Sequence, residues 1–470
     1  MRAIRLVSGL VVGFLLLSGL MVAGIVVNPA QAALTPAWVA QDPMPAAKAQ
    51  AQVATTDDGM VYLFGGVKSI LSASHEYDVV VPDSYVFNSE TGAWSAIAPM
   101  PYGARSGVAM AGDDGKVYVF GGYNQSWGSL AFTQIYDPAD DSWTLGTAMT
   151  YAEGFVTGAK GYDGLMYVMG GSDVVGYNQI YDPVGDSWSL GAPMPTPLFA
   201  GSAVPIYDGD YIVYIGGTNS WGSASVLVQY YEVGWDSWGT LDSLPVANVA
   251  CSAVYASDGL IYVMGGGNQA YNTGGLLGGQ EFFDTTYVYS LYDGSWMSAV
   301  DLHYGARYGM AAATEGKVWF FGGNNNTDVY DDVSMMQIMT VTASLSSTTV
   351  AQGDSVFLMV NPQFAYLSVS YYYMSVYVEG PTGYAYPSIE VSTSVDTPFQ
   401  IEIAVPEIAE LGDHTIVTVH LAAYSGWNSL EFELDDLTLT VVAMVPVEDL
   451  IAELEADLAE LQAALASADA

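Results

Sequence analysis

Six glycine pairs divide the first two thirds of the chain into similar units. Each pair follows a short alternating apolar run, as in YLFGG and YVMGG. The second glycines of the pairs are Gly66, Gly122, Gly171, Gly217, Gly266 and Gly323, at intervals of 56, 49, 46, 49 and 57 residues. An alternating apolar run predicts a strand, and a terminal glycine pair supplies backbone conformations that other residues avoid. The chain therefore repeats one structural unit six times.

A tryptophan stands at a nearly constant distance before each glycine pair. Trp38, Trp94, Trp143, Trp188, Trp238 and Trp296 precede the first glycine of the next pair by 27, 27, 27, 28, 27 and 26 residues. Most of these tryptophans are followed by a short turn of apolar residues and proline, such as APMP. Five of them are preceded by another strand-like run, such as QIYDP. Each unit thus holds four short strands, lettered a to d in chain order. Four antiparallel strands repeated around an axis form a propeller blade.

The tyrosine, tryptophan and diglycine positions of these units resemble the kelch motif, a repeat of about 50 residues. The resemblance covers roughly residues 36–340 and implies an all-β fold, a six-bladed kelch-type β-propeller, which we assign to residues 34–340. The last unit has no tryptophan strand after it, whereas Trp38 has no b and c strands before it. We predict that the N-terminal strand at Trp38 completes the sixth blade, because closure removes exposed sheet edges.

The repeat stops at Val341, and alternating β patterns with turn breaks continue to residue 445. Roughly seven strands in about a hundred residues predict an immunoglobulin-like β-sandwich over residues 341–445. Residues 447–468 change to a helical period with acidic flanks, which predicts a short amphipathic or coiled-coil helix. This helix either packs on the protein or mediates self-association.

Residues 1–32 have the pattern of an export signal. Arg2 and Arg5 precede a long apolar stretch, and Ala30-Gln31-Ala32 is a small-x-small cleavage site. The stretch is also long enough for an uncleaved membrane anchor. Either reading predicts that the rest of the chain is extracellular or lies at the cell surface.

The composition excludes several partners. Lysine and arginine total 9 against 50 acidic residues, for a net charge of −41. Such a surface repels phosphate backbones, so we expect no nucleic-acid binding. The single Cys251 excludes a disulfide framework and a multi-cysteine metal site. Acidic pairs in turns such as AGDDG leave Ca²⁺ open as a cofactor, although none has the spacing of a calcium loop.

Asn124 and Asn325 begin glycosylation sequons.

The candidate site lies at the end of the channel where the d–a and b–c connections meet. Equivalent strand-a positions are Ala49, Arg105, Gly154, Phe199, Val249 and Arg307, and Lys48 and Glu153 come one residue earlier in their units. The kelch resemblance implies arginine at this position. Arg105 and Arg307 either clamp a carboxylate or sulfate, or bind carbonyls at the neck of their blades.

The b–c loops carry a second pattern of amides and aromatic rings. Asn124, Trp127, Asn219, Trp221 and Asn268 lie in these loops. Aromatic faces beside amides suit sugar rings, and the alternative is ordinary polar turn chemistry with an aromatic covering the blade edge.

Three functions follow from these features. The first is an exported cell-surface module that binds extracellular glycan or protein, with the sandwich as spacer. The second is a carbohydrate-active enzyme, since six-bladed kelch proteins include a sialic-acid mutarotase that uses arginine and acid side chains. The third is a structural envelope component. A copper radical oxidase, another kelch enzyme, needs two histidine ligands and a Cys–Tyr crosslink, and no histidines group with Cys251.

Overall fold

The structure is a computed structural model. It describes residues 26–27, 34–68, 79–219, 224–269, 281–291, 293–325, 327–345, 349–351, 355–366, 371–379, 385–393, 399–404, 412–425, 428–434 and 437–442. The predicted helix at 447–468, most of the signal segment 1–32 and Trp221 lie outside these residues. Within the described part of the chain, no helix is both long and apolar enough to cross a membrane.

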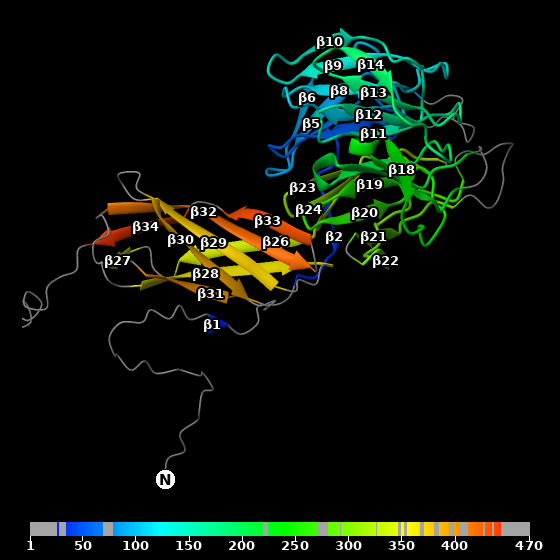
Figure 1. Cartoon of the computed structure of the whole chain (residues 1–470). Coiled ribbons are helices and arrows are strands. Elements are labelled where there is room, and N and C mark those ends of the chain that lie inside the picture. The colour runs from blue at the N-terminus through cyan, green and yellow to red at the C-terminus, as the bar shows by residue number, and fades with distance from the viewer. Residues whose placement is uncertain are drawn as a thin grey trace, which may run out of the picture.

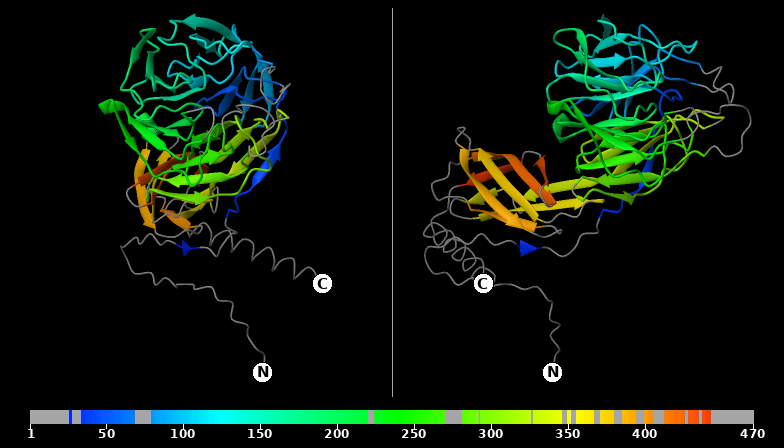
Figure 2. Two further views of the ribbon diagram at one scale, coloured as in Figure 1. Left: turned by 90° about the vertical axis from the view of Figure 1, so that its right-hand side faces the viewer. Right: turned by 45° about the vertical axis from the view of Figure 1, so that its right-hand side comes forward.

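Six four-stranded antiparallel sheets form a propeller (Figures 1 and 2). Blades one and two contain β3 (Gln52–Thr55), β4 (Met60–Phe64), β5 (Ser84–Asn88), β6 (Trp94–Ile97), β7 (Val108–Ala111), β8 (Val117–Phe120), β9 (Thr133–Asp137) and β10 (Ser142–Gly146). Blades three and four contain β11 (Val156–Lys160), β12 (Met166–Gly170), β13 (Asn178–Asp182), β14 (Ser187–Leu190), β15 (Ser202–Ile206), β16 (Tyr211–Ile215), β17 (Val228–Glu232) and β18 (Ser237–Thr240). Blades five and six contain β19 (Ser252–Tyr255), β20 (Leu260–Met264), β21 (Thr286–Ser290), β22 (Ser295–Ser298), β23 (Met310–Thr314), β24 (Lys317–Phe321), β25 (Val333–Gln337) and β2 (Trp38–Gln41).

The ring is closed. The innermost strands contact one another in the order β3, β7, β11, β15, β19 and β23, and β23 contacts β3 again. The N-terminal strand β2 pairs with β25, with Trp38 opposite Met336, so the prediction that it completes the sixth blade is confirmed. The Trp38 indole donates a hydrogen bond to the carbonyl oxygen of Val300 at 2.9 Å, and His303 Nε2 lies 2.9 Å from the Trp38 oxygen.

The repeated glycine pairs connect each blade to the next. In blade one, Gly65 and Gly66 have φ angles of 61° and 84°, and a Cβ at Gly65 would lie 2.4 Å from the carbonyl oxygen of Ala104. Without that Cβ, the Gly66 amide donates to the same oxygen at 2.8 Å. The corresponding bond from Gly323 reaches Lys48 at 2.9 Å and joins blade six to blade one. The glycine pair is therefore an inter-blade joint, which explains its recurrence.

The repeated tryptophans make a second connection between blades. The indole nitrogens of Trp143, Trp188, Trp238, Trp296 and Trp38 donate to backbone carbonyls of the preceding blade, at Ala98, Thr147, Ala192, Asp242 and Val300. Each acceptor lies four residues after the preceding tryptophan. The indole nitrogen of Trp94 is buried without a hydrogen-bond partner among the described residues. Five of the six repeated tryptophans thus hydrogen-bond to the same position of the neighbouring blade.

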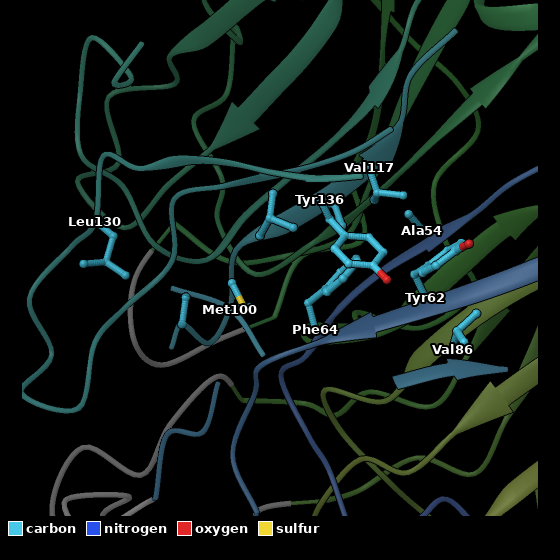
Figure 3. Close-up of a cluster of buried hydrophobic side chains, with 11 residues drawn as sticks. Ala54, Tyr62, Phe64, Val86, Met100, Val117, Leu130 and Tyr136 are labelled. Carbon is cyan, nitrogen blue, oxygen red and sulfur yellow. The ribbon is translucent and has the colours of Figure 1, made fainter. Parts of the chain in front are cut away.

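The space between blades is filled by aromatic rings. Between blades one and two, Phe64 packs against Tyr136 (Figure 3) and against Trp143, with ring centroids 5.7 and 5.1 Å apart. Phe120 repeats the contact with Trp188 of blade three at 5.3 Å. Burying such rings stabilises the ring of blades, because each removes a large apolar area from water.

Two further sheets follow the propeller. One contains β26 (Met339–Leu345), β28 (Ser355–Phe364), β31 (Phe399–Ala404) and β1 (Val26–Val27). The other contains β27 (Thr349–Ala351), β34 (Leu437–Val442), β32 (Gly412–Ser425), β29 (Tyr371–Glu379), β30 (Ala385–Thr393) and β33 (Asn428–Leu434). The immunoglobulin-like topology stays a prediction.

Tyr366 connects the C-terminal part to blades five and six. Its hydroxyl accepts a hydrogen bond from the Val300 amide at 3.1 Å, and its ring lies 6.1 Å from the Tyr262 ring. Tyr262 in turn donates to Asp258 Oδ2 at 2.6 Å. Asp258 is 1% exposed, and burial raises the pKa of its carboxyl group to about 7.

The buried Asp258 predicts that this protein loses stability as the pH rises. In the native state Asp258 keeps its proton up to about pH 7, whereas in the unfolded chain it loses it near pH 3.9. Between these values the native state binds more protons, so the free energy of unfolding decreases with increasing pH. We expect Asp258→Asn to raise Tm by a few degrees at pH 8 and to leave it unchanged at pH 4.

Calorimetry of both proteins across this range tests the expectation. The exposed Asp208→Asn variant is the matched control and should follow the wild-type curve. Equal decreases in Tm for wild type and Asp258→Asn between pH 4 and pH 8 would contradict it.

Candidate functional site

The innermost strands enclose a channel cavity of ≈ 220 Å³. Six equivalent segments line it, at residues 50–53, 106–109, 155–158, 200–203, 250–253 and 308–311. The first residue of each segment has a positive φ of 51° to 57°, and these residues are Gln50, Ser106, Phe155, Ala200, Ala250 and Tyr308. Backbone hydrogen bonds join them around the axis, for example from Gln50 to Tyr308 and from Tyr308 to Ala250. None of the described residues that line the cavity has a charged side chain.

Aromatic rings cover the channel at its d–a and b–c end. The Phe155 and Tyr308 ring centroids are 5.9 Å apart. Blades three and six are opposite each other in a six-membered ring, so this contact crosses the channel axis. Phe155 also packs against Phe199 and Tyr123, at 6.0 and 5.3 Å. This end of the channel is an apolar floor around which the candidate residues are arranged.

Arg105 lies beside this floor, buried under an indole ring. Its side chain is 1% exposed, and Cζ lies 3.6 Å from the centroid of the half-buried Trp127 ring. The Arg105 backbone exchanges hydrogen bonds with Tyr123 at 3.1 and 2.8 Å, which fixes the strand-a position against the b–c loop. The predicted residues Arg105 and Trp127 are therefore brought together, with the indole stacked on the guanidinium.

Glu153 occupies the next blade at the same end of the channel. Its side chain is 1% exposed, and burial together with the nearby charge of Asp173 raises the pKa of its carboxyl group to about 7. Glu153 also raises the pKa of the Tyr123 hydroxyl, although burial is the larger cause. The Tyr123 hydroxyl is hydrogen-bonded to the Ser172 hydroxyl. We call Arg105, Tyr123, Trp127, Glu153 and Ser172 the blade 2–3 cluster.

The blade 2–3 cluster combines groups that can bind an anion with a group that can transfer a proton. It holds a buried cation, a stacked indole, two hydroxyls and a carboxyl group that titrates near neutral pH. A carboxyl group with such a pKa can accept and return a proton at physiological pH.

The two other basic candidates lie elsewhere. Arg307 is fully buried in blade six, where its Nη1 donates to the carbonyl oxygen of Gln269 at 2.9 Å and its Cζ lies 4.8 Å from the Phe282 ring. The Nζ of Lys48 donates to the carbonyl oxygens of Gly65 and Asp83 at 2.6 and 3.0 Å. Desolvation lowers the pKa of Lys48 to about 8. Both side chains thus donate hydrogen bonds to backbone carbonyls, which is the contact that a structural role at the neck of a blade involves.

The asparagine candidates shape the b–c loops. Asn124 Oδ1 accepts from the Ser126 and Gly128 amides at 2.9 Å each, which positions Trp127 between them. Asn268 Oδ1 accepts from the Glu281 amide at 3.0 Å. The side-chain nitrogen Nδ2 of Asn325 donates to the Tyr330 hydroxyl at 2.6 Å. The side chain of Asn219 is exposed. Glycosylation of Asn124 and Asn325 stays a prediction.

No metal centre is apparent in the described part of the chain, where no three histidine, cysteine, aspartate or glutamate side chains group around a common point. The turn acids have other partners, since Asp114 and Asp163 accept hydrogen bonds from Tyr118 and Tyr167 at 2.9 and 2.8 Å. Cys251 is buried, and burial raises the pKa of its thiol to about 12.

Sequence reasoning missed Tyr123, Phe155 and Ser172. Each was available from the same count along the repeats, because Phe155 follows the strand-a position and Tyr123 and Ser172 follow the glycine pairs. The count was applied only to the strand-a position and the residue before it, whereas the residues after the strand-a position and after the glycine pairs also reach the cluster.

Comparison with known proteins places this architecture among kelch propellers. The family model described as NANM, N-acetylneuraminate epimerase, matches residues 30–342. Kelch-like protein 15 of Homo sapiens is 39% identical over 88 residues, which are 18% of this chain and 14% of that protein. The N-acetylneuraminate epimerase of Pasteurella multocida is 35% identical over 85 residues, 17% of this chain and 22% of that protein. The chain thus matches less than a quarter of the length of either relative.

A solved structure shares the fold of the propeller. The structure of YjhT superimposes with a TM-score of 0.51 at 17% identity and covers 65% of this chain and 97% of that chain.

Proposed function

The chain belongs to the N-acetylneuraminate epimerase (NANM) family, and from this premise we propose that its propeller binds an acidic sugar at the blade 2–3 cluster. The observation that carries the proposal is the buried guanidinium of Arg105 stacked under Trp127, in a cluster that also holds the buried Glu153. A sugar carboxylate replaces the indole on the guanidinium, and a bidentate pair forms in a site shielded from water. The Phe155 ring beneath supplies an apolar face for the sugar ring.

Binding of N-acetylneuraminate tests the proposal. We expect wild-type protein to bind this sugar acid, and Arg105→Ala to weaken binding by about 2 kcal/mol, or roughly thirtyfold, since a hydrogen-bonded ion pair is lost. Isothermal titration calorimetry measures the affinity, and the neutral sugar N-acetylmannosamine should bind weakly to both proteins.

Lys116→Ala is the matched control, because Lys116 is a half-buried base 3.8 Å from Asp137 and distant in the blade from the cluster. It should bind as wild type does. Unchanged affinity of a folded Arg105→Ala protein would refute the carboxylate role.

We further propose that the site interconverts the anomers of the bound sugar. The raised pKa of Glu153, about 7, favours this second function. Glu153 takes the proton of the anomeric hydroxyl as the ring C–O bond breaks and water protonates the ring oxygen. The ring closes on the opposite carbonyl face when Glu153 returns its proton to the carbonyl oxygen and the hydroxide left from water takes the proton of the attacking hydroxyl, so no oxidant or cofactor is consumed.

Export to the cell surface remains part of the proposal, and the signal pattern of residues 1–32 supports it. A mature protein that begins at Ala33 by mass spectrometry would establish cleavage, and retention of residue 1 would favour the anchor. If no sugar acid binds, a glycan array tests the broader role as a surface module for extracellular glycan or protein.

A further inference from the structure

Turns of blades three and four carry an exposed aromatic surface at the end of the propeller opposite the blade 2–3 cluster. In an antiparallel blade the a–b and c–d turns share one end, and the b–c and d–a connections share the other. Tyr162 lies in the a–b turn of blade three, Tyr207 in the a–b turn of blade four and Trp235 in its c–d turn. Their exposed fractions are 57%, 40% and 79%. Exposed rings grouped in this way indicate an interaction surface.

Backbone hydrogen bonds hold these turns together. The Tyr162 amide donates to the carbonyl oxygen of Gly209 at 3.3 Å, and the Val233 amide donates to that of Asp210 at 3.0 Å. The Tyr162 hydroxyl lies 3.3 Å from the position a Cβ would occupy at Gly234, directly before Trp235. The a–b turn of blade four therefore bridges the other two, so the three aromatic residues lie on adjoining turns at one end of the propeller. We call Tyr162, Tyr207 and Trp235 the blade 4 aromatic surface.

The aromatic residues are particular to this place. Three residues before the d-strand tryptophan, blade four has Trp235 where blade three has Gly185 and blade two has Asp140. Two residues before the turn glycine, blade three has Tyr162 where blade five has Ser257. The fold accepts small residues at both positions, so folding does not require the rings.

The charge around the rings is negative. Asp163, Asp208 and Asp210 are exposed beside the three aromatic residues. Lys160, the nearest base in the sequence, is ion-paired with Asp113, and the sequence has no lysine or arginine between Lys160 and Arg307. Aromatic faces bordered by carboxylates attract cations, above all the guanidinium group.

We propose that the blade 4 aromatic surface binds an arginine-rich segment of another protein. Arginine side chains stack on the rings while their guanidinium groups pair with the surrounding carboxylates. A second copy of this chain fits poorly, because both arginines of the described residues, Arg105 and Arg307, are buried, and of the described lysines only Lys68 is exposed. The surface is separate from the proposed sugar site, and neither proposal depends on the other.

A labelled nonamer of arginine, added to the full chain at about 150 mM salt, tests the proposal. We expect Trp235→Gly combined with Tyr162→Ser to raise Kd by about fivefold or more, since two stacking contacts are lost. Both substitutions introduce the residue of an equivalent blade position and leave the net charge unchanged. Fluorescence anisotropy measures Kd. The matched control is Val184→Ser, which changes a 97% exposed side chain in the c–d turn of blade three.

A second readout locates the contact. In protein labelled with 5-fluorotryptophan, the ¹⁹F resonance that disappears in Trp235→Gly should shift when the nonamer is added. Equal affinity of the double variant and wild type would show that only the net charge attracts the peptide, and it would overturn the proposal. Absence of binding, or concentration-dependent dimers that the double variant abolishes, would overturn it as well.

Discussion

Removal of residues 34–46 should open the propeller and lower its free energy of unfolding by about 5 kcal/mol or more. The deletion takes away the β2 ladder on β25, the 4% exposed Trp38 ring with its hydrogen bond to Val300, and the 3% exposed Met44. It also exposes the edge of β25. For a domain of this size we expect Tm to fall by about 10 °C or more and the transition to broaden. Calorimetry measures both changes.

Two point variants separate the closing strand from its individual contacts. Trp38→Phe keeps an aromatic ring but loses the indole hydrogen bond, and should cost about 1 kcal/mol. Val39→Ser changes a 50% exposed side chain of the same strand and should leave Tm nearly unchanged. A truncated chain that unfolds at the wild-type temperature with the same cooperativity would show that β2 contributes little to closure.

Replacement of Glu153 by glutamine should reduce anomeric exchange of N-acetylneuraminate by about a hundredfold, the usual contribution of one general base. Affinity for the sugar should change little, because glutamine keeps the size and an acceptor oxygen. The wild-type rate should rise with pH and level off above about pH 7, where the Glu153 carboxyl is ionised. Exchange spectroscopy of the anomeric signals measures the rate.

Asp173→Asn is the informative companion variant. The negative charge of Asp173 raises the pKa of Glu153, so its removal should move the inflection of the pH profile to lower pH without abolishing exchange. A Glu153→Gln protein that keeps the wild-type rate would remove Glu153 from catalysis and leave the sugar-binding proposal intact.

The repeats predicted the propeller because each marker residue performs a backbone task that recurs in every blade. Gly66 and Trp143 form inter-blade hydrogen bonds whose geometry depends on a fixed spacing, so the spacing is visible in the sequence. The pairing of β2 with β25 followed from counting strands. The chemistry of the site was less accessible, since the same strand-a position holds Arg105 under an indole and Arg307 against a loop carbonyl. The conformation of the b–c loop decides which partner each arginine contacts, and this conformation differs from blade to blade.

The raised pKa of Glu153 could not be predicted either. It depends on how completely the packed residues around the carboxyl exclude water, which is a property of the folded chain and not of the local sequence. The sequence placed Glu153 at the correct end of the channel, and only the packing around it indicates an acid–base role.

The order of synthesis gives the closing strand a particular role in biogenesis. Trp38 is made early, and its acceptor Val300 lies 262 residues later. Until β25 (Val333–Gln337) emerges, β2 has no partner within its blade, so the ring cannot close before nearly all of the propeller has been made. For the export proposed above, this order would keep the ring open until nearly all of the propeller has crossed the membrane.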